Sequence, residues 1–475
     1  MNARSEADIR VMRAYAIWTV IWGVVGMAVG VVIACQLFDP ALNFASTPLG
    51  PYITYGHLRP LHTNALIYGF GAGSFFCMQF YMVRRLCRVN LFSAGLARFQ
   101  LWLWNITVVL AAVSLLAGMT TSKEYHELEW PIQLLIVVIW VCFTINVLGT
   151  IYRRREREMY TSLWYMIGAL IGVAILFVGN GAQVPVSLFK SYSVYAGVND
   201  ANVQWWWGHN AVAFFFTFTP TAMIYYLLPK VTRAPIYSHR LSMFGFWGLM
   251  FFYLWTGAHH LILTPVPEWL QTVAIAFSFI LIAPSWATVI NTYMSMQGRW
   301  EQMRDNYLVK FLVVGVTFYG LQTIQGPLQA PRIFSQLIHY TDYVPGHVHM
   351  GTMGFYAMII FAALYYTVPR LWKTEIYSEP MANLHFWLAL VGHLTYNITM
   401  WIAGIQQGAM LKQIGTDGSL AYTFVETVTR IVPYWKMRAG GGVLFFLGAL
   451  LFAYNIFMTI ARSKSEMVAE EEAYA

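Results

Sequence analysis

Two histidines, His347 and His349, stand two residues apart inside an apolar stretch of the sequence. Successive residues of an α-helix are rotated by about 100°, so these imidazoles are expected to point to nearly opposite sides of one helix. Ionisable side chains inside membrane helices are costly and usually functional. The pair can therefore bind two separate cofactors, one on each side of the same helix.

Four further histidines, His62, His209, His259 and His260, lie in other apolar segments. The adjacent pair, His259 and His260, needs a bend in the chain or a third ligand from another helix to hold one ion, and His209 can supply that third nitrogen. Three imidazoles suit copper, zinc or non-haem iron. An adjacent pair alone is more often an interfacial helix end, but six intramembrane histidines predict a multi-metal redox centre.

The remaining nitrogens suit two haems. His62, together with one member of the 347/349 pair, can ligate one haem from both sides. The other member can hold a second haem from one side only, which leaves an open iron face for a diatomic gas opposite the three-histidine metal. Arg59 and Arg438 lie near the outer ends of their segments. Each suits a haem propionate, although a structural arginine that extends to the membrane surface is an equally good interpretation.

Tyr253 precedes His260 by seven residues, which is two helical turns, and so shares its face. A buried phenol beside a metal can donate a proton and an electron, while an ordinary core tyrosine is the competing interpretation. Other polar residues within apolar segments could line a proton path, although helix packing explains most of them as well. They are Ser242, Ser285, Asn291, Thr292 and Tyr319.

The elements that position these residues are expected to be membrane helices. Of the 475 residues, 58% are hydrophobic and only 11% are charged, against about 25% charged in soluble proteins. The length suits about a dozen spans of about 20 residues. We expect an all-α polytopic protein with a single membrane-embedded domain over 1–475 and short cytoplasmic tails at 1–12 and 463–475. The apolar segments run near 13–38, 57–84, 97–119, 130–152, 161–181, 204–228, 240–264, 267–293, 307–327, 344–368, 384–406 and 437–461.

Alternate loops are basic, at 84–88, 153–157 and 230–240, whereas the loop containing Glu124, Glu127 and Glu129 is acidic. The positive-inside rule then places the basic loops and both termini in the cytoplasm. With that orientation all six histidines fall at one level, in the outer third of the membrane. This convergence supports one shared site.

The four cysteines form no CxxC pair and no CxxCH haem-attachment motif, which excludes a covalent c-type haem on this chain. The net charge of +8 comes from loops and gives no nucleic-acid signal. The first apolar segment is too long for a signal peptide and has no cleavage site, so it is expected to be a retained span.

Several ordered blocks carry a family resemblance. They are Leu58-Arg59-Pro60-Leu61-His62-Thr63-Asn64-Ala65, Ser122-Lys123-Glu124-Tyr125, Glu127-Leu128-Glu129-Trp130-Pro131-Ile132, Lys190-Ser191-Tyr192-Ser193, Gln204-Trp205-Trp206, Gly208-His209-Asn210-Ala211-Val212, Ala258-His259-His260, Ala283-Pro284-Ser285-Trp286 and His339-Tyr340-Thr341-Asp342 followed by Gly346-His347-Val348-His349. From about residue 10 to 460 the chain resembles the catalytic subunit of cbb3-type cytochrome c oxidases, the C family of haem–copper oxygen reductases. The resemblance implies the twelve-helix subunit I fold.

The resemblance implies a role for each matching residue. His62 and His349 would ligate a low-spin haem b, and His347 would be the proximal ligand of a high-spin haem b. The copper ligands would be His209, His259 and His260. Tyr253 would be the redox-active tyrosine, which this family cross-links to the ligand matching His209. Glu124 resembles the family's calcium-linked glutamate, and Arg438 a propionate partner.

The resemblance also implies an activity and a location. The family reduces dioxygen to water with electrons from c-type cytochromes and pumps protons across the bacterial inner membrane. Its membrane-anchored partner subunits carry the c haems, which agrees with the absence of CxxCH here. We expect two haems b, one copper and a calcium ion, with the metal centres in the periplasmic half of the membrane.

Three departures from the family pattern stand out. The family's Thr-Phe-Glu-Gly-Pro block has Gln325 in place of its glutamate, and glutamine hydrogen-bonds without carrying charge. His57 replaces the usual arginine before Leu-Arg-Pro and can titrate near neutral pH. Gln329-Ala330-Pro331-Arg332 replaces a more apolar stretch. These changes allow a divergent, non-pumping paralogue.

Two alternatives compete with the oxidase. A nitric oxide reductase of the same superfamily would use non-haem iron with an added glutamate ligand and no active-site tyrosine, so Tyr253 favours copper. Glu268, the nearest acidic residue after the histidine pair, is expected to lie in a loop. A non-enzymatic haem protein is suggested only by Gln325, and a plain transporter would need neither six histidines at one depth nor the opposed pair.

Overall fold

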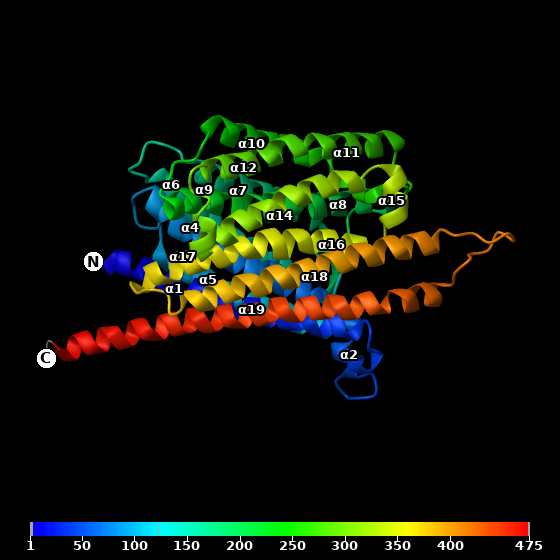
Figure 1. Ribbon diagram of the computed structural model, residues 1–475, viewed down its shortest axis with the longest axis horizontal. Helices are drawn as coiled ribbons and strands as arrows, with labels where there is room; N and C mark the ends of the chain where they lie inside the picture. The colour runs from blue at the N-terminus through cyan, green and yellow to red at the C-terminus, as the bar shows by residue number, and fades with distance from the viewer. Residues whose placement is uncertain (1–2, 122, 474–475) are drawn as a thin grey trace.

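The structure is a computed structural model that describes residues 3–121 and 123–473, so Ser122 of the second family block lies outside the described residues. Long apolar helices run side by side along one axis (Figure 1). The first half contains α1 (Ala3–Gln36), η1 (Pro40–Asn43), α2 (Gly50–Ile53), α3 (Tyr55–Asn64), η2 (Ala65–Gly71), α4 (Ala72–Leu86), α5 (Ala94–Leu116), α6 (Trp130–Tyr152), α7 (Thr161–Asn180), β1 (Gln183–Ser187), β2 (Lys190–Ser193), α8 (Gly197–Phe214) and α9 (Phe218–Thr232).

The second half continues in the same manner. It contains α10 (His239–Phe252), η3 (Tyr253–Trp255), η4 (Gly257–Leu261), α11 (Glu268–Ile280), α12 (Ile282–Ser295), α13 (Gln302–Asp305), α14 (Tyr307–Gln329), α15 (Arg332–Ile338), α16 (Tyr343–His349), η5 (Met350–Ala357), α17 (Met358–Trp372), α18 (Glu379–Leu411) and α19 (Phe424–Ala473). Glu268 begins α11, so the expectation that it lies in a loop is wrong.

Twelve helical segments of the described chain are long and apolar enough to cross a membrane, which confirms the predicted number of spans. Several spans join two or three of the elements named above, as in Tyr55–Leu86 and Tyr343–Trp372. The predicted tails are largely helical, because α1 already begins at Ala3 and α19 continues to Ala473. The helical ends simply extend the first and last spans.

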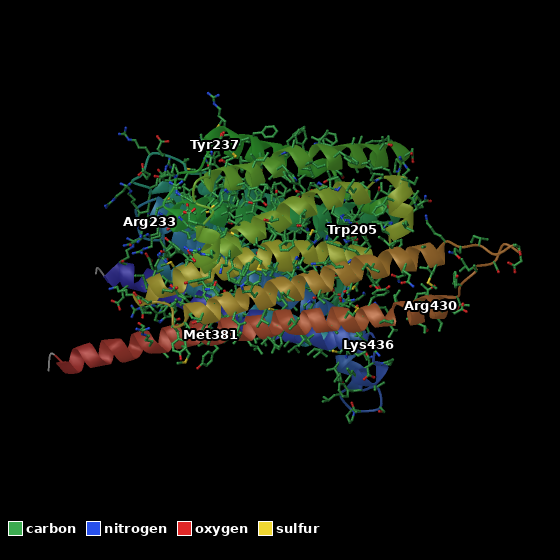
Figure 2. All side chains as sticks on the ribbon, viewed as in Figure 1. Trp205, Arg233, Tyr237, Met381, Arg430 and Lys436 are labelled. Atoms are coloured by element: carbon green, nitrogen blue, oxygen red, sulfur yellow. The ribbon has the colours of Figure 1, made fainter. Side chains whose placement is uncertain are left out.

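Both termini lie at the same end of the bundle (Figure 1). Arg233 and Tyr237, from one of the predicted cytoplasmic loops, lie toward that end, whereas Trp205 and Arg430 lie toward the other (Figure 2). This arrangement agrees with an even number of crossings. The short helix α15 lies toward the same end as Trp205 (Figures 1 and 2). The small antiparallel hairpin of β1 and β2 connects α7 to α8.

The end near the termini is built from one corner that occurs three times. In the first corner, α4 is followed by Arg88 in the left-handed region (φ 55°), and five residues later Ser93 caps α5. Asn146 of α6 then bonds both backbone groups of Ser93, accepting from its N–H at 3.1 Å and donating to its carbonyl at 2.8 Å. Thr150, one turn later, accepts from the N–H of Phe92.

The same contacts recur at the other two corners. Arg233 and Lys373 also adopt positive φ, and each precedes a capping serine, Ser238 or Ser378, by five residues. The asparagines that hold these caps, one from α12 and one from α19, are Asn291 and Asn455. The same serine–asparagine contacts therefore hold the helix ends together at all three corners. This repeat is not visible in the sequence by inspection.

Helical geometry is irregular where the histidines lie. The π-helical segments η2 and η5 begin three residues after His62 and one residue after His349. The span that starts with α10 changes to 3-10 geometry at Tyr253 and again at Gly257. Wide or tight turns of this kind are frequent at functional sites because they change the direction of side chains relative to a regular helix.

Candidate functional site

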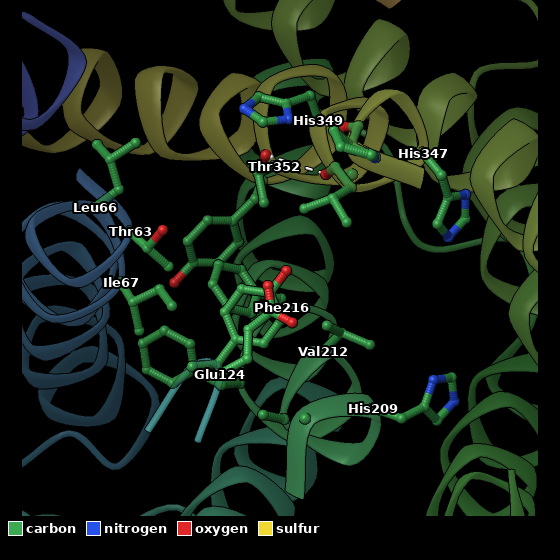
Figure 3. Close-up of a pocket in the computed structure, with 18 of the residues that line it drawn as sticks. Thr63, Leu66, Ile67, Glu124, His209, Val212, Phe216, His347, His349 and Thr352 are labelled. Atoms are coloured by element: carbon green, nitrogen blue, oxygen red, sulfur yellow. Dashed lines mark hydrogen bonds between the residues drawn. The ribbon is translucent and has the colours of Figure 1, made fainter. Parts of the chain in front are cut away.

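All six predicted histidines line one cavity of about 830 Å³ inside the bundle. Arg59, Glu124, Tyr253 and Arg438 line it as well. His347 and His209 project from different helices into the same open space, with His349 further along the helix that carries His347 (Figure 3). The structure therefore brings together the set of side chains that the sequence singled out.

Three of these histidines form a compact group. The Nδ1 atom of His209 lies 2.9 Å from the Nε2 atom of His259 and 3.3 Å from the Nε2 atom of His260. One nitrogen of each ring lies within 4.8 Å of the other two, which suits a single ion. Imidazole nitrogens bind copper and zinc well.

The chain reaches this arrangement by leaving α-helical geometry. In a continuous α-helix the adjacent side chains of His259 and His260 would diverge by about 100°. Here α10 ends at Phe252, and both histidines belong to the 3-10 segment η4. Their rings lie 4.6 Å apart, centroid to centroid, and both face His209 of α8. The chain therefore has the bend that two adjacent histidines need in order to bind one ion.

Two aromatic residues flank this group. The ring of Trp205, one turn before His209 on α8, stacks on His260 with centroids 4.0 Å apart and planes inclined by 8°. The ring of Tyr253 lies 5.2 Å from that of His209. Contrary to the prediction from the sequence, Tyr253 does not share an α-helical face with His260, because the α-helical part of the span ends just before it. Its ring lies beside His209 instead.

The other three histidines share one hydrogen-bond pattern. The Nδ1 atom of His62 lies 2.8 Å from the carbonyl oxygen of Gly26, and that of His349 lies 2.8 Å from the carbonyl oxygen of Pro345. The Nδ1 atom of His347 lies 3.0 Å from Oε1 of Gln325. An acceptor at Nδ1 fixes the proton there and leaves Nε2 as the metal-binding atom.

Close helix contact positions His62 further. A Cβ atom placed on Gly30 of α1 would lie only 2.5 Å from Cε1 of His62, so the imidazole occupies the space that the glycine leaves. Gly26, one turn earlier on α1, supplies the carbonyl acceptor. The first span thus holds the ring of His62 from two sides, and a larger residue at 30 would push it away.

Gln325 contacts two residues of α16. Besides accepting from His347, it donates from Nε2 to the hydroxyl of Tyr343 at 3.1 Å. The amide therefore bridges the two residues, with one N–H donating and its oxygen accepting. The departure from the family's glutamate therefore lies directly beside His347.

Charged residues gather where the cavity meets the Trp205 end of the bundle. Arg59 forms an ion pair with Glu124. In the same loop Glu127 accepts from the side chain of Asn64 at 3.1 Å, and burial raises its pKa. Arg438 approaches Asp342 at 4.0 Å, and burial raises the pKa of Asp342 against the opposing effect of that guanidinium.

The candidate proton-path residues separate into two groups. Ser285 and Tyr319 line the cavity. Asn291 donates to Ser242 and to the carbonyl of Ser238, so this pair belongs to the second of the three repeated corners. Thr292 is buried beside Asn291 on α12.

The two other departures from the family pattern are His57 and the stretch that ends at Arg332. His57 contacts the carbonyl oxygen of Leu116 through Nδ1 at 2.8 Å, at the point where α5 ends. Arg332, at the start of α15, forms an ion pair with Glu268 and donates to Thr272 at 3.2 Å. Both residues therefore join neighbouring elements.

Sequence reasoning missed several residues around the histidines. Tyr396 of α18 places its hydroxyl 3.3 Å from Nδ1 of His349, and its ring lies beneath the guanidinium of Arg438. His385 and His393 of the same helix are fully buried but line no part of the cavity. Their positions in the 384–406 segment could have been noted from the sequence, whereas the contact of Tyr396 with His349 has no sequence signal.

Comparison with known proteins agrees with this geometry. Residues 10–444 match the family model described as cytochrome C and quinol oxidase polypeptide I. The chain is 44% identical over 456 residues to the cbb3-type cytochrome c oxidase subunit CcoN1 of Stutzerimonas stutzeri, covering 96% of this chain and 95% of that protein. It is 43% identical to a cytochrome c oxidase subunit 1 homolog of Agrobacterium tumefaciens, covering 98% and 86%.

Two further proteins are similar to this chain at lower sequence identity. A solved haem–copper terminal oxidase dimer shares the fold, with a TM-score of 0.75 at 18% identity over 97% of this chain and 84% of that chain. A nitric oxide reductase chain of Stutzerimonas stutzeri is 24% identical, covering 86% of this chain and 87% of that protein. The chain is thus much more similar to the oxidase subunits than to the reductase.

Proposed function

The chain belongs to the haem–copper oxidase subunit I family, and we propose that its six cavity histidines form the reaction centre of a cbb3-type cytochrome c oxidase. Its identity to oxidase subunits over nearly the whole chain makes it an oxidoreductase of the cytochrome c oxidase class. The reaction is the reduction of dioxygen to water with electrons from c-type cytochromes. Proton uptake accompanies this chemistry, and we include proton pumping in the proposal.

Members of this family hold haem and copper, and the residues of the cavity fit both groups. The cavity supplies three imidazoles whose Nδ1 atoms already have acceptors, and a separate group of three that suits one ion. The Nε atom of Arg438 is buried and has no hydrogen-bond partner within the described residues. A buried guanidinium donor of this kind suits a haem propionate.

Residue roles follow from this fit. His62 and His349 would hold a low-spin haem b between them, and His347 would hold a high-spin haem b from one side. His209, His259 and His260 would hold the copper ion. When bound, the high-spin haem and the copper would supply the site where dioxygen is reduced.

Tyr253 would supply a proton and an electron from its phenol group. The proximity of its ring to His209, at 5.2 Å between centroids, supports this role and is compatible with the family's tyrosine–histidine cross-link. Ser285 and Tyr319, which line the same cavity, would be part of the route that returns a proton to Tyr253. Ser242 and Asn291 would contribute through the position of their helices.

Glu124 would ligate a calcium ion at the outer edge of the cavity. Ca²⁺ prefers carboxylate and carbonyl oxygens, and Glu124 presents its carboxylate there while paired with Arg59. Arg59 would share its charge between this glutamate and a haem propionate. Removal of calcium would then change the environment of both arginines near the propionates.

The protein is a multi-span membrane protein of a bacterial respiratory oxidase and assembles with other oxidase subunits and cytochrome c. We propose that the partners are membrane-anchored c-type cytochromes, since this chain has no CxxCH motif of its own. We also propose that the termini are cytoplasmic and the histidines periplasmic. The basic loops near the termini and the common end of both termini support this orientation.

The six histidines line one cavity, and this is the main support for the proposal. The experiment is haem and metal analysis of the purified complex, with reduced-minus-oxidised and carbon monoxide spectra. Two haems b and one copper on this chain, with carbon monoxide bound to one haem only, are expected. Non-haem iron in place of copper would identify a nitric oxide reductase, and haem without a second metal would identify a non-enzymatic relative.

A further inference from the structure

The helix α11 buries an unusual set of residues. Its buried positions are Gln271, Ala274 and Ser278, which lie three and four residues apart and so form one stripe along the helix. Two of these three are polar, although most of the other residues of α11 are apolar. Polar groups buried in a membrane helix are costly unless they are hydrogen-bonded. The stripe must therefore have partners.

The partners of this stripe lie in η4, which carries His259 and His260, and in the residues that follow it. Ser278 is the last residue of the stripe along the chain, and its Oγ atom is 2.6 Å from Nδ1 of His259. The same hydroxyl donates to the carbonyl of Ala274 at 2.7 Å. Since the hydroxyl proton is engaged by Ala274, the oxygen accepts from the Nδ1–H of His259. This contact fixes the proton on Nδ1 and directs Nε2 toward His209.

The other polar member of the stripe holds the backbone that follows. Gln271 accepts from the N–H of Leu263 at 3.0 Å and donates to the carbonyl of Val266 at 3.0 Å. Leu263 has a positive φ of 63°, a conformation that a β-carbon disfavours and that needs support from its surroundings. The amide of Gln271 provides that support directly after η4.

We propose that α11 positions the metal-binding turn, with Ser278 as the positioning residue that sets the tautomer of His259 and thereby the affinity for copper. This inference rests on the proposed function and extends it from the ligands to the residue that orients one of them. Outer hydrogen bonds to metal-binding histidines affect affinity by about 10–100-fold. Without the serine oxygen, a buried Nδ1–H would lose its acceptor, and the alternative tautomer would place the proton on the metal-binding atom.

The test compares copper retention in three variants of the whole complex. Ser278→Ala removes the acceptor, while Ser278→Thr keeps a hydroxyl at the same position. Thr272→Val is the matched control, because Thr272 also donates to the carbonyl four residues earlier on α11, at 3.0 Å, but is exposed and contacts no histidine. Each complex is titrated with a copper chelator, and copper is measured per haem.

The expected result is that Ser278→Ala releases half its copper at a chelator concentration about 10–100-fold lower than the wild type. The haem content should be unchanged, and Ser278→Thr and Thr272→Val should retain copper as the wild type does. Wild-type retention in Ser278→Ala would overturn the inference, and so would equal loss in Ser278→Thr. A wild-type complex that contains haem but binds no copper would instead contradict the proposed function itself.

Discussion

Gln325 accepts a hydrogen bond from His347 through a neutral amide oxygen 3.0 Å away, at the position where the family pattern has a carboxylate. A charged acceptor strengthens such a bond and gives the imidazole more anionic character, whereas an amide leaves it neutral. If His347 binds the high-spin haem as proposed, this uncharged side chain would weaken the electron donation from the imidazole to the iron relative to a carboxylate.

Gln325→Glu should lower the reduction potential of the high-spin haem. Hydrogen bonds to charged groups exceed neutral ones by about 1 kcal/mol, which corresponds to a shift of the order of 50 mV for one electron. A spectroelectrochemical titration measures this shift, and the low-spin haem of the same variant is the internal control. Unchanged potentials would show that the glutamine is a neutral replacement, and equal shifts of both haems would show that its effect does not act through His347.

Tyr253→Phe should abolish oxygen reduction while both haems remain spectrally present. Loss of a positioned proton donor costs about 10²–10⁴-fold in rate, and a phenyl ring keeps the packing against His209. Oxygen consumption by the purified complex is the measurement. Tyr356→Phe is the control, because Tyr356 lines the same cavity but packs its ring against Phe216, with centroids 4.7 Å apart. A fully active Tyr253→Phe enzyme would refute the role of this tyrosine.

Tyr396→Phe should change the low-spin haem alone. The hydroxyl lies 3.3 Å from Nδ1 of His349, and its removal deletes one weak contact while the ring beneath Arg438 remains. A neutral hydrogen bond is worth about 1 kcal/mol, so a shift of no more than about 50 mV is expected. Low-spin haem g values and potential provide the measurement. A change confined to the high-spin haem would contradict the assignment of His349.

The three corner asparagines should contribute similarly to stability. Asn146→Ala, Asn291→Ala and Asn455→Ala each leave two backbone groups of a capping serine unpaired, at a cost of about 1–3 kcal/mol per buried group. Thermal unfolding in detergent should show comparable losses in all three variants. Activity at a temperature where all remain folded then decides whether Asn291 does more. A selective loss of activity in Asn291→Ala would place it on the proton path.

The spans and the histidines were accessible from the sequence for clear physical reasons. A membrane helix needs about 20 apolar residues, and such runs are visible without any tertiary information. The two-residue spacing of His347 and His349 has a direct geometric meaning on a helix. The structure places both in the cavity, together with the four histidines chosen from other segments.

Other features depend on contacts that no single segment encodes. The change of the α10 span to 3-10 geometry at Tyr253 lies within an apolar pattern that also fits a continuous α-helix. Ser278 and Tyr396 acquire their significance only because α11 and α18 pack beside His259 and His349. Local sequence patterns do not specify which helices become neighbours, so these residues could not be chosen in advance.

The three repeated corners carry a consequence for the origin of the site. Counted back from the left-handed residue that ends each repeat, His62 and His347 both stand 26 residues before it, and His209 and His349 both stand 24 residues before it. One ancestral unit, duplicated twice, would account for this common numbering. In that view four of the six histidines descend from the same two ligand positions, and His259 and His260 were added to the copper site separately.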